Sequence, residues 1–406
     1  METLETFISN WWQENEAEVL GWRRHLHRHP ELSHMEYDTT RFITNVLTSA
    51  GMEPQPFPGT GTMVDIGDDG GKRRLAFRGD IDALPITEET ALPFESEVPG
   101  VMHACGHDVH TTVTLATAVA LHEYDQKYGL PIGVRCIFQP AEEVMTGGAK
   151  ELVKFGALNG VGRIVALHAE PKLRVGRVGI RIGPITSAAD TLTITVHGDG
   201  GHTSRPHLTQ DVVYGLGALV TQLPGLLSRR VDPRTGTVLV FGAINAGHAH
   251  NAIPMEGSVM GTIRTGDIKI WRKFQPLLEE LIADVLRPTG LRFSIDYIKG
   301  VPPVVNDDAT AALIAAAVRK VDPHALVEAP QSSGGEDFSW YLEEVPGAMA
   351  RLGCWRGTGP KGDLHAADLV IDEQCLGVGV RLFAGVVGQY APEAAGDLFT
   401  DDLLPE

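Results

Sequence analysis

The chain has 406 residues, and 34 Lys and Arg against 52 Asp and Glu give a formal net charge of −18. Hydrophobic residues make up 43% and charged residues 21%, which is typical of a globular protein with two or three domains and excludes a single small module. The acidic balance repels phosphate backbones and anionic lipids, so we expect neither nucleic acid nor a membrane as a partner.

The four cysteines, Cys105, Cys136, Cys354 and Cys375, show no close CxxC spacing and predict no disulfide framework. The N-terminal segment is acidic early and contains no long apolar run, so we expect neither a secretory signal nor a membrane anchor. Both observations favour a cytoplasmic location.

Apolar periodicity predicts two helices at the start of the chain, followed by alternating strands and helices. The predicted elements are helices at 2–27 and 37–50, strands at 61–67 and 73–80, a helix at 107–124, and strands at 133–140 and 163–171. This alternation predicts an α/β fold with a mixed sheet flanked by helices.

The segment from about 188 to 298 has a different rhythm, in the order βαββαβ. Its predicted elements are a strand at 190–198, a helix at 208–227, strands at 237–247 and 256–265, a helix at 268–286 and a strand at 291–300. This order predicts a ferredoxin-like insertion, after which a helix at 309–321, a strand at 348–354 and a helix at 373–390 complete the α/β part. The expected domains are therefore 1–186 and 300–406, with 187–299 inserted between them and a cleft where they meet.

Cys105 and His107 lie two residues apart at the entry of the predicted helix, a spacing that suits a transition metal. The dipole at a helix N-terminus favours the thiolate, which is the better ligand. A small buried cysteine with a surface histidine is the alternative for this motif alone.

Glu142 and Glu143 follow a buried strand, at the strand end where sites of open α/β sheets collect. Adjacent side chains on extended chain point to opposite sides, so one carboxylate could bind a metal while the other acts as general base. The alternative is a solvated acidic pair.

His168 is expected to end the strand at 163–171, and His365 precedes the last predicted helix. Together with Cys105, His107 and Glu143 they form a set of five donors. One thiolate and one carboxylate leave net positive charge on two divalent ions, as hydrolysis requires.

Several other polar residues could assist. Asp80 and Asp82 stand at another strand end, where an aspartate can fix the tautomer of a ligand histidine, although an Asp-rich turn is the alternative. In the insertion, His202 could reach an oxyanion, and Asn251 or Arg264 could contact a substrate carboxylate. Glu336 either caps a helix or lines the substrate pocket.

The chain resembles the aminoacylase and amidohydrolase branch of the peptidase M20 family over nearly its whole length. That branch includes hippurate hydrolases, indole-acetyl-amino-acid hydrolases and N-acetyl-diaminopimelate deacetylases. The resemblance rests on eight blocks in order: HLHRHPELS, FRGDIDALPI, MHACGHD, FQPAEE, GGHTSRPH, GTIRT, GGEDFSWY and LHAADLVIDE. It implies a two-metal catalytic domain with an inserted lid that often forms a homodimer surface.

The resemblance also implies roles for individual residues. Glu142 is similar to the general base that activates a metal-bound water, Asp82 to the aspartate that supports the metals, and His202 to the lid histidine of the oxyanion. Asn251 and Arg264 are similar to contacts of the substrate carboxylate, and Glu336, in the block GGEDFSWY, is our further candidate for a substrate contact. The implied metal ligands are Cys105, His107, Glu143, His168 and His365.

The expected activity is hydrolysis of small N-acyl amino acids, with a metallo-dipeptidase or carboxypeptidase acting on short peptides as the alternative. The expected cofactors are two divalent ions: Zn, with Mn, Co or Ni as alternatives. Two other hypotheses are a thiol hydrolase with Cys105 as nucleophile and His107 or His110 as its base, and a binding module without activity. His248 and His250 depart from the family pattern and leave the substrate preference open.

Overall fold

The computed structural model describes residues 2–68, 73–145 and 147–394, and the chain forms two compact units. The first unit comprises Met1–Gly183, Asn306–Pro330 and Asp337–Glu406, and the second comprises Pro184–Val305 and Gln331–Glu336. The short segment 331–336 lies in the second unit because its backbone bonds to the strand entry there, where Ser332 N donates to Ile185 O at 2.9 Å.

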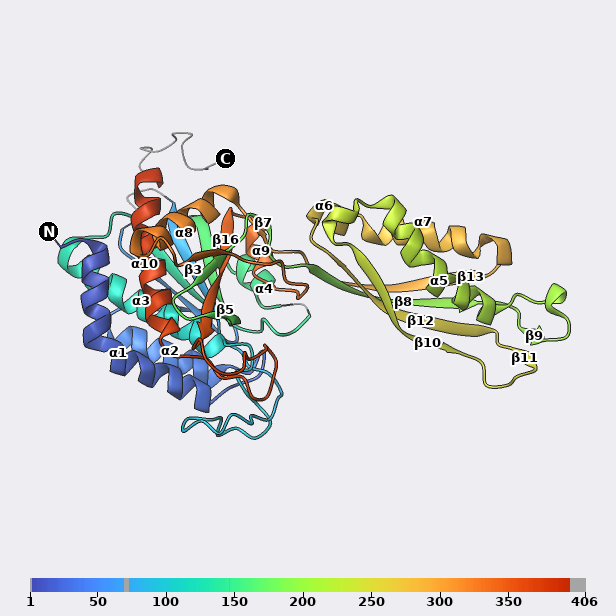
Figure 1. The fold of residues 1–406 in the computed structure, drawn as a ribbon, viewed down its shortest axis with the longest axis horizontal. Coiled ribbons are helices and arrows are strands. Elements are labelled where there is room, and N and C mark those ends of the chain that lie inside the picture. Colours follow the sequence, from blue (N-terminus) through green and yellow to red (C-terminus); the bar gives the residue numbers. More distant parts are fainter. Residues whose placement is uncertain (1, 69–72, 146, 395–406) are drawn as a thin grey trace. The chain divides into compact units, whose positions relative to one another are not determined.

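The first unit contains a mixed eight-stranded sheet (Figure 1). The strands in spatial order are β1 (Gln55–Pro56), β2 (Thr62–Ile66), β4 (Val134–Gln139), β3 (Arg74–Asp80), β5 (Val161–Arg174), β16 (Gly347–Trp355), β6 (Val178–Ile180) and β15 (Leu326–Glu328). The four central strands β4, β3, β5 and β16 run parallel, and β2 and β6 pair antiparallel at their flanks. The prediction of a mixed sheet flanked by helices is confirmed.

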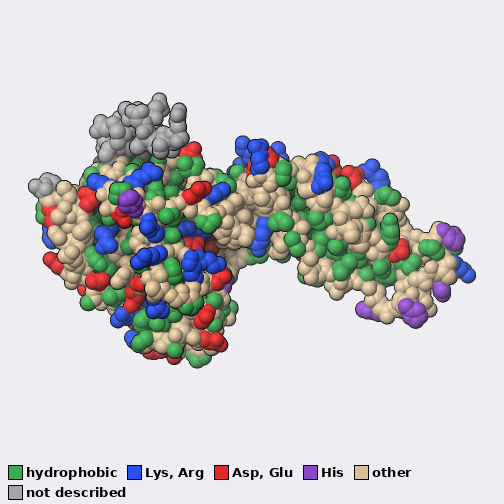
Figure 2. Space-filling view, in the orientation of Figure 1, with side chains coloured by type: hydrophobic (Ala, Val, Ile, Leu, Met, Phe, Trp, Pro, Cys, Tyr) green, Lys and Arg blue, Asp and Glu red, His purple; other side chains and the backbone are tan. Residues whose placement is uncertain are grey.

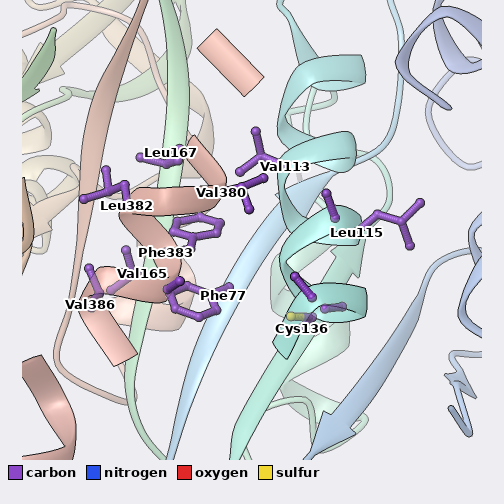
Figure 3. Packing of buried hydrophobic residues seen from close by; sticks show 14 of the residues in the cluster. Phe77, Val113, Leu115, Cys136, Val165, Leu167, Val380, Leu382, Phe383 and Val386 are labelled. Carbon is purple, nitrogen blue, oxygen red and sulfur yellow. The ribbon is translucent and has the colours of Figure 1, made fainter. Parts of the chain in front are cut away.

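Helices α3, α8 and α10 pack on the sheet, and α1 packs on α3 and α10. The phenyl rings of Phe77 and Phe383 stack at a centroid distance of 4.2 Å where α10 meets β3 (Figure 3). The helices of this unit are α1 (Leu4–Arg28), α2 (Tyr37–Ser49), α3 (His107–Tyr128), α4 (Ala149–Lys154), α8 (Asp308–Val321), α9 (Ser339–Leu342) and α10 (Cys375–Ala394).

Gly79 near the end of β3 allows α3 to approach the sheet closely. A Cβ atom at this position would lie 2.6 Å from Thr114 Oγ1 and 2.8 Å from His110 O. Because only glycine fits this gap, the first turn of α3 lies directly against the end of β3. This contact positions the polar residues that follow β3 beside those that begin α3.

The second unit contains an antiparallel four-stranded sheet in the order β10-β12-β8-β13 and the helices α5 and α7. The predicted single helix at 268–286 is wrong, because the chain forms two helices there. Pro276 has no N–H and its ring would clash with the carbonyl of Arg272 in a continuous helix. The elements are β8 (Ala188–His197), α5 (Val212–Arg230), β10 (Val238–Ala246), β12 (Glu256–Thr265), α6 (Ile268–Trp271), α7 (Phe274–Leu286) and β13 (Arg292–Val301).

Short elements complete the structure, and within its described residues no helix is both long and apolar enough to cross a bilayer. Strand β9 pairs with β11 in the second unit, and β7 pairs with β14 where the chain enters and leaves that unit. The short elements are β7 (Gly183–Pro184), β9 (Gly201–His202), β11 (Ala252–Ile253), β14 (Val305–Asn306), and the 3₁₀ turns Pro206–Leu208, Pro233–Thr235 and Arg287–Thr289.

Candidate metal centre

His107 is the first residue of α3 and lies at the centre of the candidate site. Its Nδ1 atom lies 2.9 Å from Asp82 O and 3.1 Å from Asp82 Oδ1, so it donates its proton to Asp82. The Nε2 atom is buried and finds no hydrogen-bond partner among the described residues. A buried imidazole with one nitrogen bonded to a carboxylate and the other left open has the arrangement of a metal ligand.

Two other predicted donors, Cys105 and Glu143, lie close to this nitrogen. Ligand atoms of Cys105, His107 and Glu143 all lie within 4.8 Å of one another. Glu143 Oε1 is 3.8 Å from His107 Nε2, and Glu142 Oε2 lies at the same distance. Both carboxylates therefore approach one imidazole.

The expectation that Glu142 and Glu143 point to opposite sides is wrong. It assumed extended chain, but Ala141 has a φ of 56°, in the left-handed region. The residues after β4 bend instead of continuing as a strand. After this turn both carboxylates lie 3.8 Å from His107 Nε2, and each side chain is only 10% exposed.

The remaining two donors extend the cluster on both sides. His168 Nε2 lies 3.6 Å from Cys105 Sγ, and its Nδ1 atom bonds to Ala169 O at 2.8 Å. His365 Nε2 lies 3.4 Å from Glu143 Oε1, with its side chain half-exposed. The structure thus brings all five predicted donors together. His168 does not end its strand as expected, because β5 continues to Arg174 alongside β16.

The site disfavours charge on its buried sulfur and on one histidine. Burial raises the pKa of the Cys105 thiol well above its ordinary value, and Glu143 and Glu142 act in the same direction. Burial, with a contribution from Arg351, holds the pKa of His168 well below its usual range. A cation placed between these donors would reverse the balance at the sulfur, because it stabilises the thiolate.

The pKa values of His107 and His365 shift upward, in contrast to that of His168. Burial disfavours the charged form of His107, but the carboxylates of Asp80 and Asp82 outweigh it and raise its pKa well above the usual value. Contact with Glu143 raises the pKa of His365. The site therefore attracts positive charge, which is the property that a cation centre needs.

Asp82 supports two of the donors at once. Besides accepting from His107, its Oδ2 atom accepts from Glu143 N at 3.0 Å and from Ser33 Oγ at 2.7 Å. Burial opposes ionisation, but the bond with His107 outweighs it and lowers the pKa of Asp82. The carboxylate therefore fixes both an imidazole ring and the backbone of the loop after β4.

Asp80 is buried beside the site, with its Oδ2 atom 3.7 Å from His107 Nε2. It accepts from Arg78 and from His110 Nδ1, the latter at 2.7 Å. His110 Nε2 in turn accepts from Ala169 N at 2.7 Å. Both ring nitrogens of His110 are thus engaged, which argues against His110 as the base of a Cys105 nucleophile.

Sequence reasoning missed two buried carboxylates that hold the loop bearing Glu142 and Glu143. Glu36 accepts from Ala141 N at 2.8 Å, and Asp337 accepts from Ala149 N at 2.9 Å. The contacts join residues more than 100 positions apart. Asp337 stands inside the block GGEDFSWY, whereas Glu36 lies three residues beyond HLHRHPELS and carried no signal in the sequence.

The four other predicted residues lie in the second unit. His202 and Asn251 are exposed near β9 and β11, and Figure 2 shows histidines gathered at this end of the unit. Arg264 Nη1 donates to Ser333 O at 2.5 Å. Glu336 is buried and lies two residues before Phe338, the N-cap of α9.

The donors fit divalent cations. A thiol, a carboxylate and three imidazoles are the ligand types of Zn and neighbouring transition metals, and His107 Nε2 makes no hydrogen bond within the described residues. A mixed α/β sheet with such a centre and a carboxylate beside it is the arrangement of a metal-dependent hydrolase.

The chain belongs to peptidase family M20/M25/M40, whose profile matches residues 76–389. A protein of Rhodococcus jostii named as a glutamate–cysteine ligase is 48% identical over 90% of this chain, which spans only 46% of that relative's length. An N-acetyl-L-cysteine deacetylase of Bacillus subtilis is 36% identical, with 89% of this chain and 85% of the deacetylase covered. A solved Bacillus subtilis structure, described as a dinuclear metal binding peptidase of the M20 family, has a TM-score of 0.80 and 31% identity, with 92% and 98% of the two chains covered.

Proposed function

We propose that this protein hydrolyses N-acyl amino acids to a carboxylic acid and a free amino acid, with Glu142 as general base. The observation that carries the proposal is the buried, open Nε2 atom of His107, facing both Glu142 and Glu143 at 3.8 Å. The proposed ligands of two divalent ions, Zn first and Mn, Co or Ni as alternatives, are Cys105, His107, Glu143, His168 and His365.

The two ions would supply polarisation of the amide carbonyl and acidification of a water molecule. Glu142 takes the proton from the attacking water and delivers it to the leaving amine nitrogen. Asp82 keeps the proton of His107 on Nδ1, so that Nε2 stays free to ligate. Asp82 is buried, so water does not compete for its hydrogen bond with His107 Nδ1.

We further propose that the second unit is the lid and the homodimerisation surface, with His202 donating to the oxyanion and Asn251, Arg264 and Glu336 contacting substrate. Edge strand β10 supports the dimer, because its Val238, Val240 and Ile244 expose about half of their surface. Light scattering on Val240→Lys should report a monomer if this edge pairs, and an unchanged dimer would exclude it.

The names of the relatives guide the choice of substrate. The deacetylase of Bacillus subtilis is named for N-acetyl-L-cysteine, and the relative in Rhodococcus jostii for a ligase of glutamate and cysteine. We therefore propose cysteine derivatives as the first substrates to test. All four cysteines of this chain are buried and free, which supports a reducing cytoplasm as its location.

The test is Glu142→Gln, which keeps the shape of the side chain and removes the base. We expect kcat on N-acetyl-L-cysteine to fall by about 10²–10⁴-fold while two metal ions per chain remain bound. Glu151→Gln on α4 makes the same change at an exposed position and should leave kcat unaltered. A Glu142→Gln enzyme as active as the parent would refute the proposal. If the parent enzyme hydrolyses dipeptides faster than N-acetyl-L-cysteine, the peptidase alternative is favoured.

A further inference from the structure

Glu36 is a fully buried carboxylate immediately before α2, and both of its oxygens are bonded. Oε1 accepts from Ala141 N at 2.8 Å, and Oε2 accepts from Thr60 Oγ1 at 2.7 Å. A buried carboxylate is retained only where such bonds compensate its loss of hydration. The bonds to Ala141 N and Thr60 Oγ1 therefore compensate the burial of Glu36.

Ala141 is the residue directly before Glu142, and it has the left-handed φ of 56°. This conformation is unfavourable for a residue with a Cβ atom, so surrounding bonds must hold it. Glu36 holds the Ala141 amide on one side, and Gly148 N donates to the Ala141 carbonyl at 2.8 Å on the other. Without the first bond, the turn that aims Glu142 loses one of its two supports.

The segments that contact Glu36 also pack closely against Pro140. A Cβ atom at Gly61 would lie 2.6 Å from Pro140 Cδ. Gly61 N donates to Thr40 Oγ1 at 2.8 Å, and that hydroxyl donates to Glu36 O at 2.6 Å. The backbone and the side chain of Glu36 thus both contact segments that enclose the Pro140–Ala141 peptide.

Different carboxylates hold the two neighbouring glutamates. Glu36 bonds the amide that precedes Glu142, whereas Asp82 bonds the amide of Glu143 itself at 3.0 Å. We propose that Glu36 is a positioning residue for the general base Glu142 and not for the metal ligand Glu143. This inference rests on the proposed function of Glu142.

The test compares Glu36→Ala and Glu36→Gln in metal-loaded enzyme. Displacement of a catalytic group by about 1 Å costs about 10²-fold in rate, so we expect Glu36→Ala to lower kcat by about 10- to 100-fold. KM should change less than about threefold and two metal ions per chain should remain bound, because Glu143 keeps its bond to Asp82. Glu36→Gln should retain most of kcat, because its amide oxygen can still accept from Ala141 N.

Glu31→Ala is the matched control. Glu31 also accepts from backbone amides, Thr39 N at 2.7 Å and Asp38 N at 3.2 Å, but these belong to the first turn of α2. We expect this variant to lower the midpoint of thermal unfolding while kcat stays within about twofold. The same midpoint measured for the Glu36 variants separates a loss of stability from a loss of positioning.

Two results would overturn the inference. One is parent-like kcat per metal-loaded Glu36→Ala chain with only a lowered unfolding midpoint, and the other is a loss of bound metal. If Glu36→Ala does not fold, Thr60→Val removes the hydroxyl that orients the carboxylate while keeping the shape, and an unchanged kcat in that variant would also overturn it. A fully active Glu142→Gln enzyme would instead refute the proposed function, so the two failures are distinguishable.

Discussion

Replacing Arg23 by leucine should destabilise the first unit strongly. Arg23 is 1% exposed, and its Nε atom lies 2.8 Å from Asp108 Oδ2, beside the ligand candidate at the start of α3. Opposite charges with centres about 4 Å apart interact by about 4 kcal/mol at an effective dielectric constant of about 20. Breaking a buried pair costs about 3–5 kcal/mol, so we expect a loss of that size in the free energy of unfolding.

The size of this loss should depend on pH, because His27 is the other cation that contacts Asp108, at 2.8 Å. Burial lowers the pKa of His27, but the bonds to Asp108 and Glu88 outweigh burial and raise it. A raised pKa means that the stabilisation is complete below the unfolded value of about 6.5 and disappears as pH rises through the folded value. The Arg23→Leu deficit should therefore grow between about pH 6 and about pH 9.

Urea denaturation followed by the fluorescence of Trp11 and Trp12 on α1 measures this deficit at both pH values. Arg23→Leu combined with Asp108→Asn is the control, because it removes the unpaired charge and should recover part of the loss. A deficit below about 1 kcal/mol at both pH values would refute the reasoning about the buried pair.

Three further variants test other parts of the structure. Asp82→Ala should weaken divalent-metal binding by about 10–100-fold in competition with a chromophoric chelator, and unchanged affinity would exclude its supporting role. Gly79→Ala places a Cβ atom 2.6 Å from Thr114 Oγ1 and should cost about 1–3 kcal/mol in thermal unfolding, so a neutral result would contradict the close packing of α3. Asp190→Ala removes the acceptor 3.0 Å from Trp271 Nε1 and should speed hydrogen exchange in the second unit alone, whereas an effect on both units would contradict their division.

Much of the architecture could be predicted from local patterns. The apolar period of 2–27 and the alternation of 256–265 depend on neighbouring residues only, and the structure has α1 and β12 close to those bounds. The break between α6 and α7 carried a signal as well, in Pro276, but the apolar period on both sides outweighed it in the prediction. Elements were therefore predictable wherever one local signal dominated.

The arrangement of the site was only partly predictable. Residue types and strand ends indicated the five donors, because metal ligands and catalytic carboxylates are chemically distinctive. Glu142 and Glu143 both approach His107 after a bend at Ala141, whose left-handed φ no local pattern specifies for an alanine. The bond from Glu36 crosses 105 positions and likewise leaves no trace in the local sequence.

The order of strands in the sheet has a consequence during synthesis. Strand β5 pairs with β16, yet about 170 residues separate the end of one from the start of the other. A ribosome that adds about 5–20 residues per second needs on the order of 10–30 seconds to make that stretch. Throughout that interval one edge of β5 in the nascent chain has no partner strand, so the N–H and C=O groups along that edge stay open to pairing with other chains.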